Sequence, residues 1–230
     1  MVSILSGSLK IDSTSKVKIE GNAYRDTEGD ANRVKGALAL QWGVPGTIEA
    51  GADVQIVNNH ASGVYIMSGA KLLMNSGVIM NNRTINGVSE YGGGIYNEHQ
   101  YGTVTLDPSV VLYNNHAETA GDDIYSTGTI SFAKVGSDWG LDDCDHRING
   151  WYYDGDPACQ EDSTAKRWNA HGDEPFMEEF QLTDATVTVT GTRALKAAHD
   201  LRVDDGLPAL LAGLWLNTND HYSYLIGYSD

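Results

Sequence analysis

The chain has 230 residues, 41% of them hydrophobic, with 31 acidic and 15 basic side chains and a formal net charge of −16. This length is sufficient for one good core, whereas the negative charge argues against nucleic acid and anionic membranes as partners, because both select clustered Lys and Arg. No segment approaches the roughly 18 consecutive apolar residues of a membrane span.

A short block recurs four times in the first half of the chain: two apolar residues in alternate positions, followed by asparagine. The blocks are Val17–Asn22, Val54–Asn59, Gly77–Asn82 and Val110–Asn115. Their last asparagines lie 37, 23 and 33 residues apart. This spacing is too irregular for a helical solenoid of fixed period, but it is natural for a coil that tolerates insertions on one face.

Two further apolar segments accompany each block. One precedes it across a corner of small residues, and the other follows it as an aromatic motif that occurs three times. The motif is present at Gly63–Ile66, Gly94–Asn97 and Asp123–Ser126. Three short strands per turn, with apolar side chains inward at every other position, predict an all-β parallel β-helix whose stacked coils bury one continuous core.

Three phrases resemble the right-handed parallel β-helix repeats of bacterial surface and secreted proteins of the adhesin-like and autotransporter-like kinds. They are Gly93–Asn97, Asn114–Ala117 and Gly121–Tyr125, and the resemblance covers roughly residues 7 to 135. It implies a right-handed helix, here of about four to six coils. It also implies surface display, often with attachment to a host surface or a glycan, and it names no reaction.

This resemblance and the composition together set the expected context of the chain. Residues 1–20 lack the basic and then apolar order of a signal peptide. We therefore expect an excised fragment of a bacterial protein, secreted or on the cell surface, whose export signal and anchor lie outside this sequence. Three regions are expected: β-helix coils at 1–135, an insertion at 136–181, and a final strand with a C-terminal cap at 182–230.

The recurrent asparagines are predicted to be structural. Asparagine at a coil corner tolerates left-handed backbone, and its amide bonds to the coils above and below when it stacks in register. We expect Asn22, Asn59, Asn82 and Asn115 to form such a ladder. The glycosylation sequence that begins at Asn82 is a single short match to which we give no weight.

The tyrosines of the third strand are the candidate ligand-binding residues. Alternation sends the residue before each one inward, so Tyr65, Tyr96 and Tyr125 are expected to point outward in a flat row. Two interpretations remain open. The rings stabilise the coils by stacking, or they form a platform for an extended glycan or a protein on a host surface. Trp151 and Tyr152 are a second place for such a site.

Residues 136–181 hold both cysteines and many acidic residues. A disulfide between Cys144 and Cys159 would close a loop of about 15 residues and stabilise the fold by about 3 kcal/mol, and it is the favoured interpretation for an exported chain. No cofactor is expected, but two metal interpretations stay open. Zinc would use the two cysteines with His146 and His171. Calcium would use Asp142, Asp143, Asp145, Asp154 and Asp156.

The last fifty residues combine different patterns. The alternating sequence at 185–190 predicts a strand with its threonines outward, and 193–199 has the composition of a short helix. The apolar run at 207–216 is the candidate cover for an open solenoid end, because such ends expose core and unpaired backbone.

An enzyme is the alternative to a binding stalk, because parallel β-helices also host polysaccharide lyases and glycoside hydrolases. Such chemistry needs carboxylates at a defined separation or a base beside calcium. Glu118, Asp122 and Asp123 are the candidates, although paired acids are expected by chance among 31 acidic residues. The sequence favours a non-enzymatic protein.

Overall fold

The computed structural model describes residues 1–22, 35–84, 91–107, 109–132, 139–140, 147–153, 187–191 and 193–199. All regular structure in these residues is β-strand, and none of them is helical. The described part of the chain accordingly contains no helix long and apolar enough to cross a membrane.

The strands form three sheets, which we call A, B and C. Sheet A contains, in spatial order, β1 (Val2–Ile4), β4 (Gly36–Leu40), β7 (Ser62–Ile66), β10 (Ile95–Asn97), β13 (Ile124–Ser126), β18 (Arg193–His199), β16 (Arg147–Tyr153) and β15 (Trp139–Gly140). Sheet B contains β17 (Val187–Thr190), β14 (Thr129–Phe132), β11 (Thr103–Leu106), β8 (Lys71–Met74), β5 (Pro45–Ile48) and β2 (Leu9–Ile11). Sheet C contains β12 (Val110–Tyr113), β9 (Gly77–Met80), β6 (Asp53–Val57) and β3 (Lys16–Glu20).

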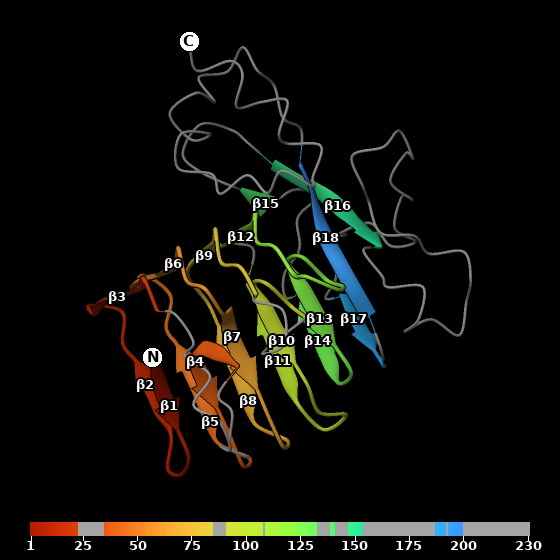
Figure 1. Ribbon diagram of the computed structural model, residues 1–230. Coiled ribbons are helices and arrows are strands. Elements are labelled where there is room, and N and C mark those ends of the chain that lie inside the picture. The colour runs from red at the N-terminus through yellow and green to blue at the C-terminus, as the bar shows by residue number, and fades with distance from the viewer. Residues whose placement is uncertain are drawn as a thin grey trace.

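Consecutive strands of the chain therefore lie in different sheets, and every third strand returns to the same sheet (Figure 1). From β1 to β14 all pairings between neighbouring coils are parallel. Strands β1 to β12 make four coils, and β13 and β14 begin a fifth. The predicted parallel β-helix is confirmed.

The recurrent apolar residues form the inner wall of sheet C. Ile19 pairs with Ile56, Ile56 with Ile79, and Ile79 with Leu112. Their side chains are buried in one hydrophobic cluster to which all three sheets contribute. Because each strand sends alternate side chains inward, stacking the coils joins short apolar strands into a continuous core.

The parallel order ends at the fifth coil. Strand β17 pairs antiparallel with β14, and β18 pairs antiparallel with β13. The expectation of a strand near 185–190 is confirmed, with Thr188 and Thr190 exposed. The expectation of a helix at 193–199 is wrong, because this segment is β18. The unpaired edge of β13 offers it backbone hydrogen bonds, which outweigh a weak local helix preference.

The three corners between the sheets differ in length. The A–B corner, which joins sheet A to sheet B, consists of short turns that follow one another along the lower edge of Figure 1. The C–A corner, which joins sheet C to the next strand of sheet A, is long in coils 1, 3 and 4 and short in coil 2. Within coils 1 to 4, long insertions thus occur only at the C–A corner, as the irregular asparagine spacing suggests.

Candidate functional site

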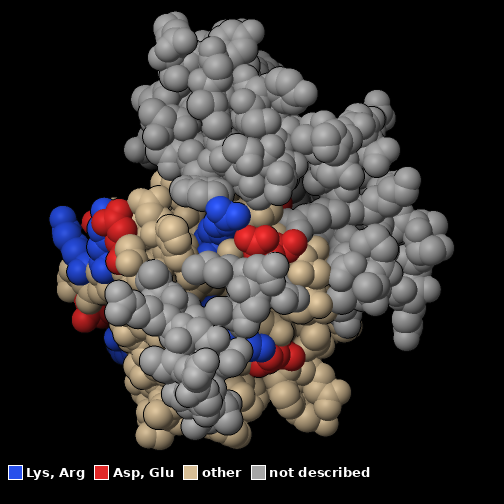
Figure 2. All heavy atoms as spheres, in the orientation of Figure 1, with Lys and Arg blue, Asp and Glu red and all other residues tan. Residues whose placement is uncertain are grey.

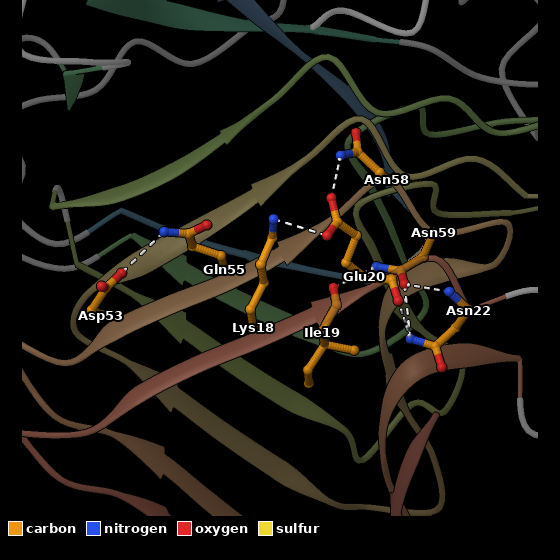
Figure 3. Close-up of polar contacts among 8 residues, drawn as sticks. All are labelled: Lys18, Ile19, Glu20, Asn22, Asp53, Gln55, Asn58 and Asn59. Carbon is orange, nitrogen blue, oxygen red and sulfur yellow. Dashed lines mark hydrogen bonds and ion pairs between the residues drawn. The ribbon is translucent and has the colours of Figure 1, made fainter.

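The recurrent asparagines form one continuous column of hydrogen bonds at the C–A corner. The Asn22 Nδ2 donates to Asn59 Oδ1 at 3.0 Å (Figure 3). The same bond is 2.8 Å from Asn59 to Asn82 and 2.9 Å from Asn82 to Asn115. Each of these oxygens also accepts the backbone N–H of the preceding asparagine. All the amides of the column therefore point in the same direction.

A different asparagine adopts the left-handed backbone conformation at this corner. Positive φ angles of 54°, 56° and 53° occur at Asn58, Asn81 and Asn114, each directly before a ladder residue, and Gly21 takes this place in coil 1 with 67°. We expected one asparagine both to adopt the left-handed backbone and to bond to the next coil, but two neighbouring residues share these roles. Asn82 is only 1% exposed and its Nδ2 bonds to Asn115, so its glycosylation sequence is inaccessible in the folded protein.

Asp123 ends the column at the fifth coil. Its Oδ1 accepts the backbone N–H of Asn115 at 3.1 Å and the Asn115 Nδ2 at 3.0 Å. Its neighbour Asp122 accepts the N–H of Ala117 at 2.9 Å and lies 3.1 Å from His116 Nδ1. Both carboxylates are 1% exposed. The acids that we considered for catalysis therefore support the corner, and Glu118 pairs with Arg83 at 3.2 Å.

The three tyrosines are in register but they are not a surface. Tyr65 pairs with Tyr96, and Tyr96 pairs with Tyr125, in sheet A. Their side chains lie outside the main core, yet they are 1%, 7% and 8% exposed. The rings are tilted, with centroids 5.5 Å apart in the first pair, and T-shaped at 5.7 Å in the second. The expected flat and exposed platform is absent, and these rings pack with Tyr91 and Ala39 in a second hydrophobic cluster.

A carboxylate holds the outer end of this tyrosine cluster. Glu98 accepts hydrogen bonds from the hydroxyls of Tyr65 and Tyr96, the latter at 3.3 Å, and it pairs with Lys35. The Lys35 Nζ also lies 5.2 Å from the centre of the Tyr96 ring. Burial alone would raise the pKa of Glu98, but the bonds from Lys35 and Tyr65 outweigh it and lower that pKa below its ordinary value.

Burial raises the pKa of the Tyr65 and Tyr96 hydroxyls, and the bond to the Glu98 carboxylate raises it further. Both phenols therefore stay neutral donors to an ionised acceptor. Tyr65, Tyr96, Tyr125 and Glu98 therefore form a closed structural cluster that offers no exposed aromatic face to a ligand.

Exposed aromatic side chains lie instead at the A–B corner. Trp42 is 63% exposed and Tyr101 is 69% exposed, and Leu5 at the same corner of coil 1 is 58% exposed. We call the turns that carry these three side chains the exposed corner. These three are the most exposed large hydrophobic side chains among the described residues, and all three lie at this corner.

Trp42 is also held in an unfavourable backbone conformation. Its φ is +52° and that of Gly43 is +75°, and the N–H of Val44 donates to the Gln41 carbonyl at 3.0 Å. These values define a type I′ turn, whose first central position favours Asn, Asp or Gly. A left-handed backbone costs a residue with a side chain about 1–2 kcal/mol. An exposed tryptophan recovers little of this by packing, which makes Trp42 a candidate for a functional role.

Tyr101 reaches the same row from coil 4. Its turn, residues 98–102, is one residue longer than residues 41–44 in coil 2 and residues 67–70 in coil 3. The extra residue places Tyr101 over the turn of coil 3, where a Cβ added to Gly69 would lie 3.6 Å from the Tyr101 Cβ. The ring centroid of His99 is 5.2 Å from that of Tyr101, and His99 Nδ1 accepts the Tyr101 N–H at 3.3 Å.

Sequence reasoning missed this site. Trp42 lies before Gly43 in a two-residue turn, and Ser68–Gly69 is its counterpart one coil later. Aligning the turns as well as the strands would have shown that a tryptophan occupies a position where a small residue is normal.

The remaining predicted residues are not tested by this structure. Cys144, Cys159 and the other candidate metal ligands, Asp142, Asp143, Asp145, Asp154, Asp156, His146 and His171, lie outside the described residues. Trp151 and Tyr152 lie in β16, and their backbones pair with β18. Among the described residues, no group of three or more His, Cys, Asp or Glu side chains is arranged to bind a metal.

Comparison of the chain with family models, curated proteins and solved structures finds no match.

Proposed function

We propose that this chain is a non-enzymatic β-helix segment of a bacterial cell-surface or secreted protein, and that it binds a glycan through its exposed corner. The observation that carries the proposal is the position of Trp42 and Tyr101. Both residues are more than 60% exposed, and they belong to the same corner of coils 2 and 4. The fold and the resemblance of its repeats to adhesin-like proteins support the surface location.

The residue types of the corner favour a glycan. Aromatic faces provide flat apolar area for the C–H faces of sugar rings, and the tyrosine hydroxyl adds a polar contact. The corner is built from the short turns 41–44, 67–70 and 98–102.

The enzyme alternative receives no support from the described acids. Asp122 and Asp123 are buried, and their oxygens accept backbone N–H groups. Glu98 is tied to two phenols and an ammonium group. A hydrolase needs one carboxyl group that donates a proton and a second that is free to act on the opposite face of the sugar.

The test is a binding screen over a panel of neutral and acidic polysaccharides by affinity electrophoresis, with three variants. Trp42→Asn and Tyr101→Ser are expected to reduce binding at least about tenfold each, as for interface residues that contribute more than 1 kcal/mol. Leu73→Ser is the matched control, because Leu73 is 39% exposed on β8 and away from the corner. It should leave binding unchanged.

The Trp42→Asn variant has a second readout. Asparagine tolerates the left-handed conformation, so this variant is expected to be as stable as the wild type or more stable by up to about 1 kcal/mol. Loss of binding together with unchanged or increased stability supports a functional role for Trp42. Wild-type protein that binds no polysaccharide, or a Leu73→Ser variant that loses binding equally, would overturn the proposal.

A further inference from the structure

The first coil forms an open end of the described solenoid. Strands β1, β2 and β3 lie at the edges of their sheets, and among the described strands each pairs on one side only, with β4, β5 and β6 (Figure 1). At the other end, antiparallel β18 and β17 cover the edges of β13 and β14. Within the described residues, coil 1 is therefore the coil that presents a free parallel edge in all three sheets.

The apolar core is less well covered at this end. Ile4 and Val17 pack against the core but are only partly buried, whereas their partners in coil 2, Leu40 and Val54, are 0% and 1% exposed. Three of the exposed large hydrophobic side chains also belong to coil 1 or its start: Met1, Val2 and Leu5. A free strand edge beside exposed apolar groups is the kind of surface that adds a strand from another chain.

Alternate backbone groups of β3 face this free edge. The Asp53 N–H donates to the Ser15 carbonyl at 2.9 Å, so the odd-numbered residues of this strand bond to β6. Backbone groups of successive residues point to opposite sides of a strand within the sheet. The N–H and C=O groups of Lys16, Lys18 and Glu20 therefore point away from β6 and are positioned to pair with another strand.

The outward side chains of β3 make its edge complementary to a second β3 in the antiparallel direction. Lysine on an edge strand usually discourages further pairing. When two β3 strands pair about a two-fold axis at Ile19, however, Lys18 of each copy lies opposite Glu20 of the other. Opposite charges in directly opposed positions stabilise a sheet. The same register pairs the edge-facing backbone groups of residues 18 and 20, and it sets Ile19 opposite its copy on the inner face.

Lys18 and Glu20 already bind each other, and a second copy adds to this pair without replacing it. Lys18 Nζ lies 2.8 Å from Glu20 Oε2, and Glu20 Oε1 accepts a bond from Asn58 Nδ2 at 2.9 Å (Figure 3). The Lys18 and Glu20 side chains remain 53% and 42% exposed. An ammonium group has three donors and a carboxylate about four acceptor sites, so both groups keep capacity for the other copy. Two such pairs form a ring of alternating charge, which contributes more than isolated exposed pairs do.

From these observations we infer that coil 1 is a homodimer interface, in which two copies of the chain stack end to end with their β3 strands antiparallel. A two-fold axis at Ile19, perpendicular to the helix axis, exchanges sheets A and B, so β1 of each copy lies over β2 of the other. It also brings Leu5 of the A–B corner close to its own copy. A two-fold contact uses the same surface on both copies and closes at two. Dimerisation of this kind is independent of glycan binding.

Sedimentation velocity over a range of protein concentrations tests the interface. The wild type is expected to form a reversible dimer with a Kd below about 100 µM, as for a weak specific complex. Lys18→Glu and Glu20→Lys each set like charges opposite one another at two places, and each should weaken the dimer about tenfold or more. An equimolar mixture of these two variants should dimerise within about threefold of the wild type, because every altered residue then faces an opposite charge.

A control variant and a residue-level measurement locate the contact. Lys71→Glu makes the same change of charge on β8 in coil 3, and it should leave the Kd within about threefold of the wild-type value. In hydrogen exchange followed by NMR, the amides of Lys18 and Glu20 should become protected as protein concentration rises. The amide of Ile19, which faces β6, should not change. Circular dichroism and the melting temperature establish that each variant is folded.

Several results would overturn this interface. A wild type that stays monomeric up to about 300 µM would exclude a dimer of the expected strength. Assembly that continues beyond two copies would exclude a closed two-fold contact. A dimer that Lys18→Glu leaves unchanged, or a mixture of the two variants that fails to recover, would exclude the antiparallel pairing of β3 strands.

Discussion

Replacing Asn82 tests whether the asparagine column stabilises the solenoid through the direction of its amides. The Asn82 side chain makes four hydrogen bonds at 1% exposure. Its Oδ1 accepts the backbone N–H of Asn59 at 3.2 Å and the Asn59 Nδ2 at 2.8 Å. Its Nδ2 donates to the Ile56 carbonyl at 2.8 Å and to Asn115 Oδ1 at 2.9 Å.

The Asn82→Ala variant loses all four bonds and leaves buried donors and acceptors without this partner. At about 1 kcal/mol per bond, we expect its free energy of unfolding to fall by about 4 kcal/mol. Asn82→Asp keeps the accepting oxygen but turns the second oxygen toward two acceptors, Ile56 O and Asn115 Oδ1. It should be at least as destabilising at pH 7, and less so at low pH, where a protonated carboxyl group can donate one bond.

The control is the reverse change, from aspartate to asparagine, at Asp123, which ends the column. Asp123→Asn keeps an oxygen for both donors of Asn115 and loses only the assistance of the charge, so we expect a loss of about 1 kcal/mol. Urea unfolding followed by circular dichroism measures each value. The reasoning is refuted if Asn82→Asp costs less than about 1 kcal/mol, or if Asp123→Asn costs as much as Asn82→Ala.

Three further predictions concern the second cluster, a tight contact and a turn. Because the folded state lowers the pKa of Glu98 below about 4.5, its stabilising contribution is complete above that pH and disappears as pH falls through the lowered value. Urea midpoints of Glu98→Gln and wild type should therefore differ at pH 7 and converge near pH 2. Gly94→Ala should lower the free energy of unfolding by about 2 kcal/mol or more, because its Cβ would lie 2.5 Å from the Asp123 carbonyl oxygen; equal melting temperatures would contradict this. Asn58→Val should cost about 1–2 kcal/mol in urea unfolding because φ is +54°, whereas Asn58→Gly should change stability by less than about 0.5 kcal/mol.

The fold was predictable because apolar and polar residues alternate along each short strand, and this local pattern recurs from coil to coil. Ile19, Ile56 and Ile79 occupy the second apolar position of their blocks, and the structure pairs them directly. Alternation fixes which face of a strand is inward, and equal spacing from a corner fixes the register. Neither inference requires knowledge of distant contacts.

The fate of the tyrosines could not be predicted in the same way. Alternation correctly separates Tyr65 from the main core, but outward direction does not determine exposure. The burial of Tyr65 involves Glu98 and Lys35, which are 33 and 30 residues away in the chain and belong to different coils. Such contacts depend on the lengths of corners, which carry no periodic signal. The helix expected at 193–199 failed for a related reason, because a distant strand edge determined its conformation.

Trp42 illustrates the opposite difficulty. The tryptophan lies in a turn just after the apolar residues of β4, and it is distinguished only by a backbone angle and an exposed fraction. A residue that violates local preference is poorly predicted by rules that describe those preferences. The same violation makes it recognisable once the backbone is known.

The C–A and A–B corners join successive coils in different ways. At the C–A corner, the side-chain amides from Asn22 to Asn115 join successive coils, so insertions of different length can follow the asparagines without breaking the register of the strands. At the A–B corner the turns are short, and buried side-chain hydrogen bonds hold those of coils 4 and 5, where Asn97 Nδ2 donates to the Gly102 carbonyl at 3.1 Å and to Ser126 Oγ at 3.0 Å. A side chain such as Trp42 can change there without altering the core, because its neighbours in the next coil are Ser68 and Gly69. Variation in ligand preference among related coils should accordingly concentrate at the A–B corner, while the asparagine column stays constant.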